Sequence, residues 1–262
     1  MEFKTITYEV KNNIGIITLN RPETYNAISE YMCKELTKVL ICAERDDNVR
    51  TLLLKSEGKA FSSGGDINDM KDSLSRSTTE ILEFVNCFTR MAKQLITFSK
   101  PTVCAAQGVV AGAGFSMVLA CDVTIAAENI RLMQAFGNVG LLPDSGSCYL
   151  LARVVGLSRA KELVFSRRTV EADEAKRLGI VHDVVALEDL EQTALALAEQ
   201  YAAGPTRAFA MAKGIINASM ESTLEQVLDS ETYRQTALFA TEDFREGVVA
   251  FLEKRKPEFK GK

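Results

Sequence analysis

Asp144 is the charged residue best placed for chemistry, in the segment LLPDSGS from Leu141 to Ser147. A carboxylate in an apolar setting can act as a general base, because burial raises its pKa. The same segment also predicts ordinary turn chemistry, in which Asp144 would cap a helix that begins near Ser145. Taken alone, these residues leave both interpretations open.

Two turns of small residues, SSGGD (Ser62 to Asp66) and AGAGF (Ala111 to Phe115), each follow a predicted buried strand. Glycine permits left-handed backbone and the close approach of another molecule. Free N–H groups that converge from two such turns form an oxyanion hole. Glycines at these turns are also common packing devices. Gly112, Gly114 and then Met117 lack the third glycine of a dinucleotide-binding turn.

Other groups for acid–base chemistry are few. His182 is the only histidine, in a predicted strand, so we expect it to be structural and exclude a histidine-based triad. Asp66 closes a glycine turn and is expected to cap the next helix, whereas Asp122 is expected to be hydrogen-bonded at the start of a strand. Catalysis would therefore depend on a carboxylate, a backbone dipole or a lysine.

Strands and helices that could position these residues alternate over the first 140 residues, which predicts an α/β fold with crossover connections. The predicted elements are a hairpin (ITYEV, IGIITLN), a helix from Ile28, a strand (TLLLK), a helix (Thr78 to Phe98), a strand (PTVCAAQ), a turn (GVVAGAG), a helix (FSMVLAC) and a strand (DVTIAA). Helices predominate after Ser145, and Gly204-Pro205 is the clearest break. We expect a core of residues 1–200 and a C-terminal helical segment of residues 201–262.

The composition is typical of a globular protein, with 47% apolar and 25% charged residues and a net charge of -4. This charge gives no basic surface for nucleic acid or anionic lipid. Six cysteines without a CxxC pair predict buried, reduced thiols. Pro101 to Cys121 is uncharged, but its glycines and Gln107 favour a buried strand, turn and helix over a membrane span. The start, MEFKTITYEV, lacks the layout of a signal peptide, so we expect a cytoplasmic protein without membrane partners.

Several stretches, in order along nearly the whole chain, resemble the crotonase (enoyl-CoA hydratase/isomerase) superfamily. They are IGIITLNRPETYNAIS, KAFSSGGDI, KPTVCAAQGVVAGAGFSMVLACDVTIAAENIRL, GLLPDSGSCYLLARVVG, ADEAKRLGIVHDVV and EDFREGVVAFLEKRKPEF. The resemblance implies a spiral of repeated ββα units with a C-terminal helical trimerisation segment. It also implies a homotrimer or dimer of trimers, an acyl-CoA thioester substrate, no metal, and no cofactor apart from the coenzyme A of the substrate.

By motif position, the resemblance implies that the N–H groups of Gly65 and Ala113 stabilise a thioester enolate. Family members often have glycine at the second position, but alanine supplies the same N–H group. The resemblance also implies a set of residues that bind the substrate and coenzyme A: Ala27, Lys59, Ser63, Gly64, Asp66, Ile67, Gly112, Ser116, Phe136 and Pro143.

Hydratases that resemble this chain carry two glutamates, where this sequence has Ser116 and Phe136, so efficient hydration is doubtful. Asp144 occupies the position of a carboxylate in Δ3-Δ2-enoyl-CoA isomerases and in ring 1,2-epoxyphenylacetyl-CoA isomerases. The resemblance therefore implies isomerisation of a 3-enoyl-CoA to the 2-enoyl-CoA. Hydration, ring-substrate isomerisation and a non-enzymatic binding role remain alternatives.

Overall fold

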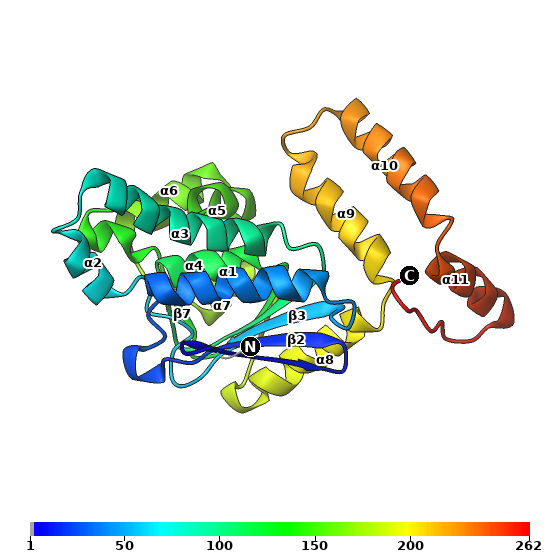
Figure 1. Ribbon diagram of the computed structural model, residues 1–262, viewed down its shortest axis with the longest axis horizontal. Helices are drawn as coiled ribbons and strands as arrows, with labels where there is room; N and C mark the ends of the chain where they lie inside the picture. The colour runs from blue at the N-terminus through cyan, green and yellow to red at the C-terminus, as the bar shows by residue number, and fades with distance from the viewer. Residues whose placement is uncertain (1–2) are drawn as a thin grey trace.

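The computed structural model describes residues 3–262 and contains a six-stranded sheet of order β1-β2-β3-β4-β6-β9 (Figure 1). The first two residues of the MEFKTITYEV segment lie outside this range. β1 and β2 form the predicted antiparallel hairpin, and the other neighbours are parallel. The strands are β1 (Ile6–Lys11), β2 (Ile14–Leu19), β3 (Thr51–Ser56), β4 (Thr102–Ala106), β6 (Val123–Ala127) and β9 (Asp183–Val185).

A smaller sheet, of β5 (Val109–Ala111), β7 (Arg131–Met133) and β8 (Val170–Glu171), lies beside the first. Two single bridges continue this layer, because Ile28 pairs with Gly65 and Ser62 pairs with Val110. Successive turns of the chain therefore place one extended segment in each layer before a helix follows. This arrangement confirms the predicted spiral of ββα units.

The predicted turn at GVVAGAG is wrong in its first half. Val109–Ala111 form β5, which pairs with β7 on one side and with Ser62 on the other. Valine is β-branched and favours this extended pairing. The turn itself begins at Gly112, whose φ of +50° suits glycine.

Helices cover both faces of the large sheet. On one side lie α1 (Glu30–Arg45), α3 (Thr78–Ile96) and α4 (Ala113–Ala120), and on the other lies α8 (Leu190–Ala202) (Figure 1). Every residue of α4 is buried, as expected of a helix that is apolar all round. The uncharged stretch around it is therefore a buried strand, short strand and helix. In the described part of the chain, no helix combines the length and apolar character needed to cross a membrane.

The predominance of helices after Ser145 is confirmed. They are α5 (Ser147–Val155), α6 (Leu157–Ser166), α7 (Ala172–Arg177), α8, α9 (Thr206–Ser219), α10 (Leu224–Leu238) and α11 (Glu242–Glu253). α8 packs on the sheet through Ala194 and Ala198, whereas α9–α11 extend away from the core (Figure 1). α2 (Ile67–Ser73) begins directly after the first glycine turn.

Candidate active site

The two glycine turns contact each other through their backbones. Gly64 has a φ of +95°, and a Cβ atom built on it would lie 2.9 Å from Ala111 O and 3.6 Å from Gly112 Cα. A side chain at Gly64 would therefore be strained and would separate the turns. The sequence predicted two turns that could converge, and the spiral brings them together because their segments are neighbours in the small layer.

Both predicted oxyanion donors lie in these turns. Within residues 3–262, neither the N–H of Gly65 nor that of Ala113 donates a hydrogen bond to a protein acceptor. Ala113 is the first residue of α4, so its N–H lies at the positive end of the helix dipole. Ser62 fixes the first turn, since its Oγ donates to Asn26 O and accepts from Gly64 N–H. This arrangement can stabilise an oxyanion.

The main chain of Asp144 is tied to α4. Ser116 Oγ lies 3.2 Å from Asp144 O, to which it donates, and 3.4 Å from Gly112 O. The N–H of Ser147 also donates to Asp144 O, at 2.9 Å. Ser116 is completely buried. Ser116 therefore connects the main chain of Asp144 with the helix that begins at Ala113.

The alternative in which Asp144 caps a helix is wrong. α5 begins at Ser147, its N-cap residue is Gly146, and no side chain caps it. The Asp144 carboxylate instead accepts from Ser145 Oγ, at 2.9 Å from Oδ1. The side chain lies outside the α5 cap because Ser145 and Gly146 both have left-handed backbone and separate it from the helix.

Burial raises the pKa of Asp144, and hydrogen bonds from Ser145 and from its own N–H offset only part of that rise. No lysine, arginine or histidine in residues 3–262 forms an ion pair with it. A carboxylate with a raised pKa is a stronger base once it is ionised. Asp144 therefore has the electrostatic surroundings of a proton carrier.

Phe136 and Pro143 lie next to these groups. Phe136 belongs to a short 3-10 helix (Ala135–Val139), and its ring lies 3.9 Å from the position of a Cβ built on Gly112. Both residues are buried, and Pro143 O accepts from Cys148 Sγ at 3.3 Å. The ring therefore covers the second glycine turn with apolar surface. Cys148 is exposed, so the expectation that the cysteines are buried is wrong at this position.

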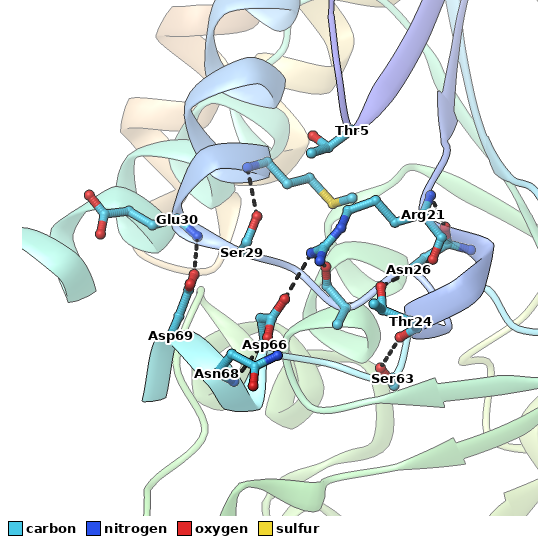
Figure 2. A network of polar contacts seen from close by, with 12 residues as sticks. Thr5, Arg21, Thr24, Asn26, Ser29, Glu30, Ser63, Asp66, Asn68 and Asp69 are labelled. Carbon is cyan, nitrogen blue, oxygen red and sulfur yellow. Dashed lines mark hydrogen bonds and ion pairs between the residues drawn. The ribbon is translucent and has the colours of Figure 1, made fainter. Parts of the chain in front are cut away.

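Asp66 has a different environment from Asp144. Its side chain caps α2 as predicted, accepting from Asn68 N–H, and forms an ion pair with Arg21 at 2.9 Å (Figure 2). Burial acts to raise its pKa, but the hydrogen bonds and the charge of Arg21 outweigh this, so the pKa is lowered. In Figure 2, Asp69 likewise points to the N–H of Glu30, at the start of α1. These contacts fix the first turn against the N-terminal segment.

The remaining predicted binding residues lie along the segments 24–27 and 59–67. Ser63 Oγ donates to Thr24 O, and its N–H donates to Tyr25 O. Ala27 is buried, whereas Lys59, Ser63 and Ile67 are exposed at the rim. Their roles in binding coenzyme A stay predictions.

His182 and Asp122 lie apart from these residues and have structural contacts. His182 Nδ1 accepts from Thr124 N–H, and the histidine precedes β9 by one residue. Asp122 accepts from Thr102 and forms an ion pair with Lys213. In the portion that the structure describes, no group of three or more histidine, cysteine, aspartate or glutamate side chains could hold a metal ion.

Sequence reasoning missed three residues around the site, namely Arg21, Asn26 and the hydroxyl of Ser145. Asn26 joins two loops, since it donates to Glu57 O and Ala60 O and accepts from Arg21 N–H. The polar residues of NRPETYNA were the available signal in the sequence, and the structure buries Asn26 completely. No local pattern indicated that Ser145 would contact Asp144.

A family model described as enoyl-CoA hydratase/isomerase matches residues 9–262. The chain is 37% identical over 266 residues to the trans-2-decenoyl-(acyl-carrier-protein) isomerase of Streptococcus mutans, with both chains fully covered. It is also 37% identical over 263 residues to the 1,2-epoxyphenylacetyl-CoA isomerase of Escherichia coli K12, again with both fully covered. A crystal structure of a putative enoyl-CoA hydratase from Streptomyces coelicolor matches with a TM-score of 0.96 and 33% identity, covering 100% of this chain and 96% of that one.

Proposed function

The chain belongs to the enoyl-CoA hydratase/isomerase family, and within that family we propose that it converts a 3-enoyl-CoA thioester to the 2-enoyl-CoA. The attachment of Asp144 to α4 supports this proposal most directly. Ser116 donates to Asp144 O, and the same helix begins with the N–H of Ala113. The main chain of the residue that carries the carboxylate and one oxyanion donor are thus joined to the same helix.

The proposed reaction is a 1,3-proton shift. Asp144 removes the C2 proton, and the C–H electron pair enters an enolate whose charge rests on the thioester oxygen. The N–H groups of Gly65 and Ala113 stabilise that charge. Asp144 then returns the proton at C4, where the electron pair of the C3–C4 double bond forms the new C–H bond. The enolate pair forms the C2–C3 double bond as the thioester carbonyl is restored. Because one group both takes and gives the proton, the proposal needs no metal or redox cofactor; coenzyme A is part of the substrate.

Hydration is the less favoured function of this site. Adding water needs a group that activates the water molecule and a second group that handles the C2 proton. Ser116 and Phe136 supply neither, and the Phe136 ring favours exclusion of water from the second glycine turn. Ring-substrate isomerisation by the same carboxylate remains the second candidate, since a relative carries the name 1,2-epoxyphenylacetyl-CoA isomerase.

The test is a spectroscopic assay of a medium-chain 3-enoyl-CoA, in which formation of the conjugated 2-enoyl thioester is followed. We expect turnover by the wild type and its loss in Asp144→Ala, with an unchanged circular dichroism spectrum. Asp47→Ala, which alters an exposed aspartate, is the matched control. Full activity of Asp144→Ala, or hydration of crotonyl-CoA by the wild type that is faster than isomerisation, would contradict the proposal.

Parallel assays with the acyl-carrier-protein thioester and with 1,2-epoxyphenylacetyl-CoA test which carrier the enzyme uses and whether it accepts the ring substrate.

We also propose that the protein acts as a homotrimer in the cytoplasm, or as a dimer of trimers. The C-terminal helices expose large apolar side chains that a second copy could cover, including Met220, Leu224, Phe251 and Leu252. Light scattering should give a mass of about three or six times the 28.8 kDa of one chain. A monomer at micromolar concentration would contradict this assembly.

A further inference from the structure

The turn that carries Asp144 has a backbone conformation that serine adopts poorly. Ser145 has a φ of +53° and Gly146 a φ of +81°, so two successive residues are left-handed. Glycine adopts this conformation without steric cost, whereas residues with a Cβ atom seldom do. Ser145 is only 4% exposed, so its side chain is enclosed. A serine at this position therefore indicates a contact made by the hydroxyl, since the backbone alone would favour glycine.

That contact is with the proposed base. Ser145 Oγ lies 2.9 Å from Asp144 Oδ1, to which it donates. Within residues 3–262, no other side chain forms a hydrogen bond with either carboxylate oxygen of Asp144. Ser116 and Ser147 donate to the main-chain carbonyl instead. The main chain is thus fixed by two donors, and Ser145 supplies the side-chain contact that orients the carboxylate, beside the N–H of Asp144 itself.

Two thiols of the described residues lie near Asp144 or its turn. The pKa of Cys33, on α1, is raised first by its contact with Cys87, then by burial and by the charge of Asp144. Cys148, on α5, donates to Pro143 O. In the described residues no cation contributes to the pKa of Asp144, so its hydrogen bonds are what offset the effect of burial.

We propose that Ser145 is a positioning residue for the isomerisation, and this inference rests on the function proposed above. Its hydroxyl holds Oδ1 of Asp144, which leaves Oδ2 to accept the C2 proton and to return it at C4. The electron pair of the C2–H bond enters the enolate and then forms the C2–C3 double bond, while the pair of the C3–C4 double bond forms the new C4–H bond, so no co-reactant is needed. Ser145 itself neither gains nor loses a proton.

Removal of the Ser145 hydroxyl should change the dependence of activity on pH. A hydroxyl that donates to a carboxylate stabilises the ionised form. Its removal should therefore raise the pKa of Asp144 and move the acid limb of the kcat profile to higher pH. We also expect kcat at neutral pH to fall about tenfold with little change in KM, because the base is less well oriented.

The experiment compares Ser145→Gly and Ser145→Ala with the wild type, using full-length protein and a 3-enoyl-CoA. Ser145→Gly relieves the left-handed strain, so it should fold at least as stably, and its loss of rate cannot come from unfolding. Lys254→Gly is the matched control, because Lys254 also has a positive φ (+55°) but lies at the end of α11. Its profile should be that of the wild type.

An unshifted acid limb in both Ser145 variants, with Asp144→Ala inactive, would overturn the role of Ser145 and leave the proposed function standing. Activity in Asp144→Ala would overturn both. A titration of the Asp144 carboxyl by carbon NMR measures the same effect without turnover. A higher pKa in Ser145→Gly supports the proposal, and an unchanged pKa contradicts it.

Discussion

Two aspartate turns of the molecule look alike in sequence and differ in their partners. Asp66 and Asp144 each follow a turn residue, glycine or proline, and each precedes a helix. Asp66 caps its helix and is paired with Arg21, whereas Asp144 caps no helix and accepts a hydroxyl from Ser145. As a result, the pKa of Asp66 is lowered despite its burial, and that of Asp144 is raised by burial.

The presence or absence of a cation decides between two uses of a buried carboxylate. A paired carboxylate stays ionised, holds other groups in place and is a poor base. A carboxylate without a cation is costly to ionise, and this makes it suited to accept and release a proton. Arg21 lies 45 residues from Asp66 in the chain, so no local pattern separates the two turns.

The largest expected difference between the two turns is in catalysis. Asp144→Asn should lower kcat for isomerisation by about 10³-fold, because general-base catalysis contributes about 10²–10⁴-fold. Asp66→Asn should change kcat per folded molecule by less than about tenfold, since its side chain holds the loop and moves no proton. Steady-state kinetics with a 3-enoyl-CoA measures both. Equal losses of kcat in the two variants would contradict the different roles assigned to Asp66 and Asp144.

The free energy of unfolding should respond in the opposite order, with a larger loss when Asp66 is replaced than when Asp144 is replaced. Asp66→Asn breaks a largely buried ion pair, so we expect a loss of about 2–3 kcal/mol in the free energy of unfolding. This corresponds to a fall of about 5–10 °C in the melting temperature. Glu83→Gln, in the exposed pair with Arg90, should cost less than about 1 kcal/mol and serves as the control. Thermal and urea unfolding measure the difference, and a neutral Asp66→Asn would contradict it.

A smaller effect is expected when the link between the Asp144 turn and α4 is removed. Ser116→Ala deletes the hydroxyl that donates to Asp144 O, so the base should be less well placed. We expect kcat to fall about tenfold with KM within about twofold. Thr236→Ala, which removes a comparable hydroxyl–carbonyl bond in α10, should leave kinetics unchanged. A change confined to KM would show that Ser116 acts on binding.

The smallest effect concerns the pH dependence of stability. The pKa of Asp66 is lower in the folded protein than in the unfolded chain, where it is about 3.9. The ionised carboxylate therefore stabilises the fold above the unfolded pKa, and this stabilisation is lost as the pH falls through the folded pKa. The folded pKa of Asp144 is raised, so its ionised form costs stability at neutral pH and the cost disappears on acidification.

Asp144→Asn should therefore melt slightly higher than the wild type at about pH 7, and the difference should vanish in acid. Asp66→Asn should melt lower at about pH 7, with a difference that narrows in acid. Melting temperatures measured from about pH 7 to pH 3 test both signs. A lower melting point for Asp144→Asn at neutral pH would contradict the assignment of its environment.

Much of the molecule was predictable from its residues. The β-rich runs and helical periods predicted the hairpin, the helix α1 and the helical C-terminal segment, because local propensity and burial agree there. The predicted start of that helix at Ile28 is wrong, since Ile28 pairs with Gly65 and α1 begins at Glu30. The ordered motifs identified the family, and Gly64 and Gly112 marked positions that need positive φ. These features are determined locally, by side-chain size, backbone freedom and the periodicity of apolar residues.

Only the tertiary structure decided which turns meet and which charges pair. The spiral stacks the segment of Gly64 beside that of Gly112, and it brings Ser116 to Asp144 O across 28 positions of sequence. It also pairs Arg21 with Asp66, whereas no cation of residues 3–262 forms an ion pair with Asp144. Such contacts depend on the register of neighbouring turns, which local sequence does not contain. The amino acids supplied two similar aspartates, and the packing around each gave one an ion pair and the other a raised pKa.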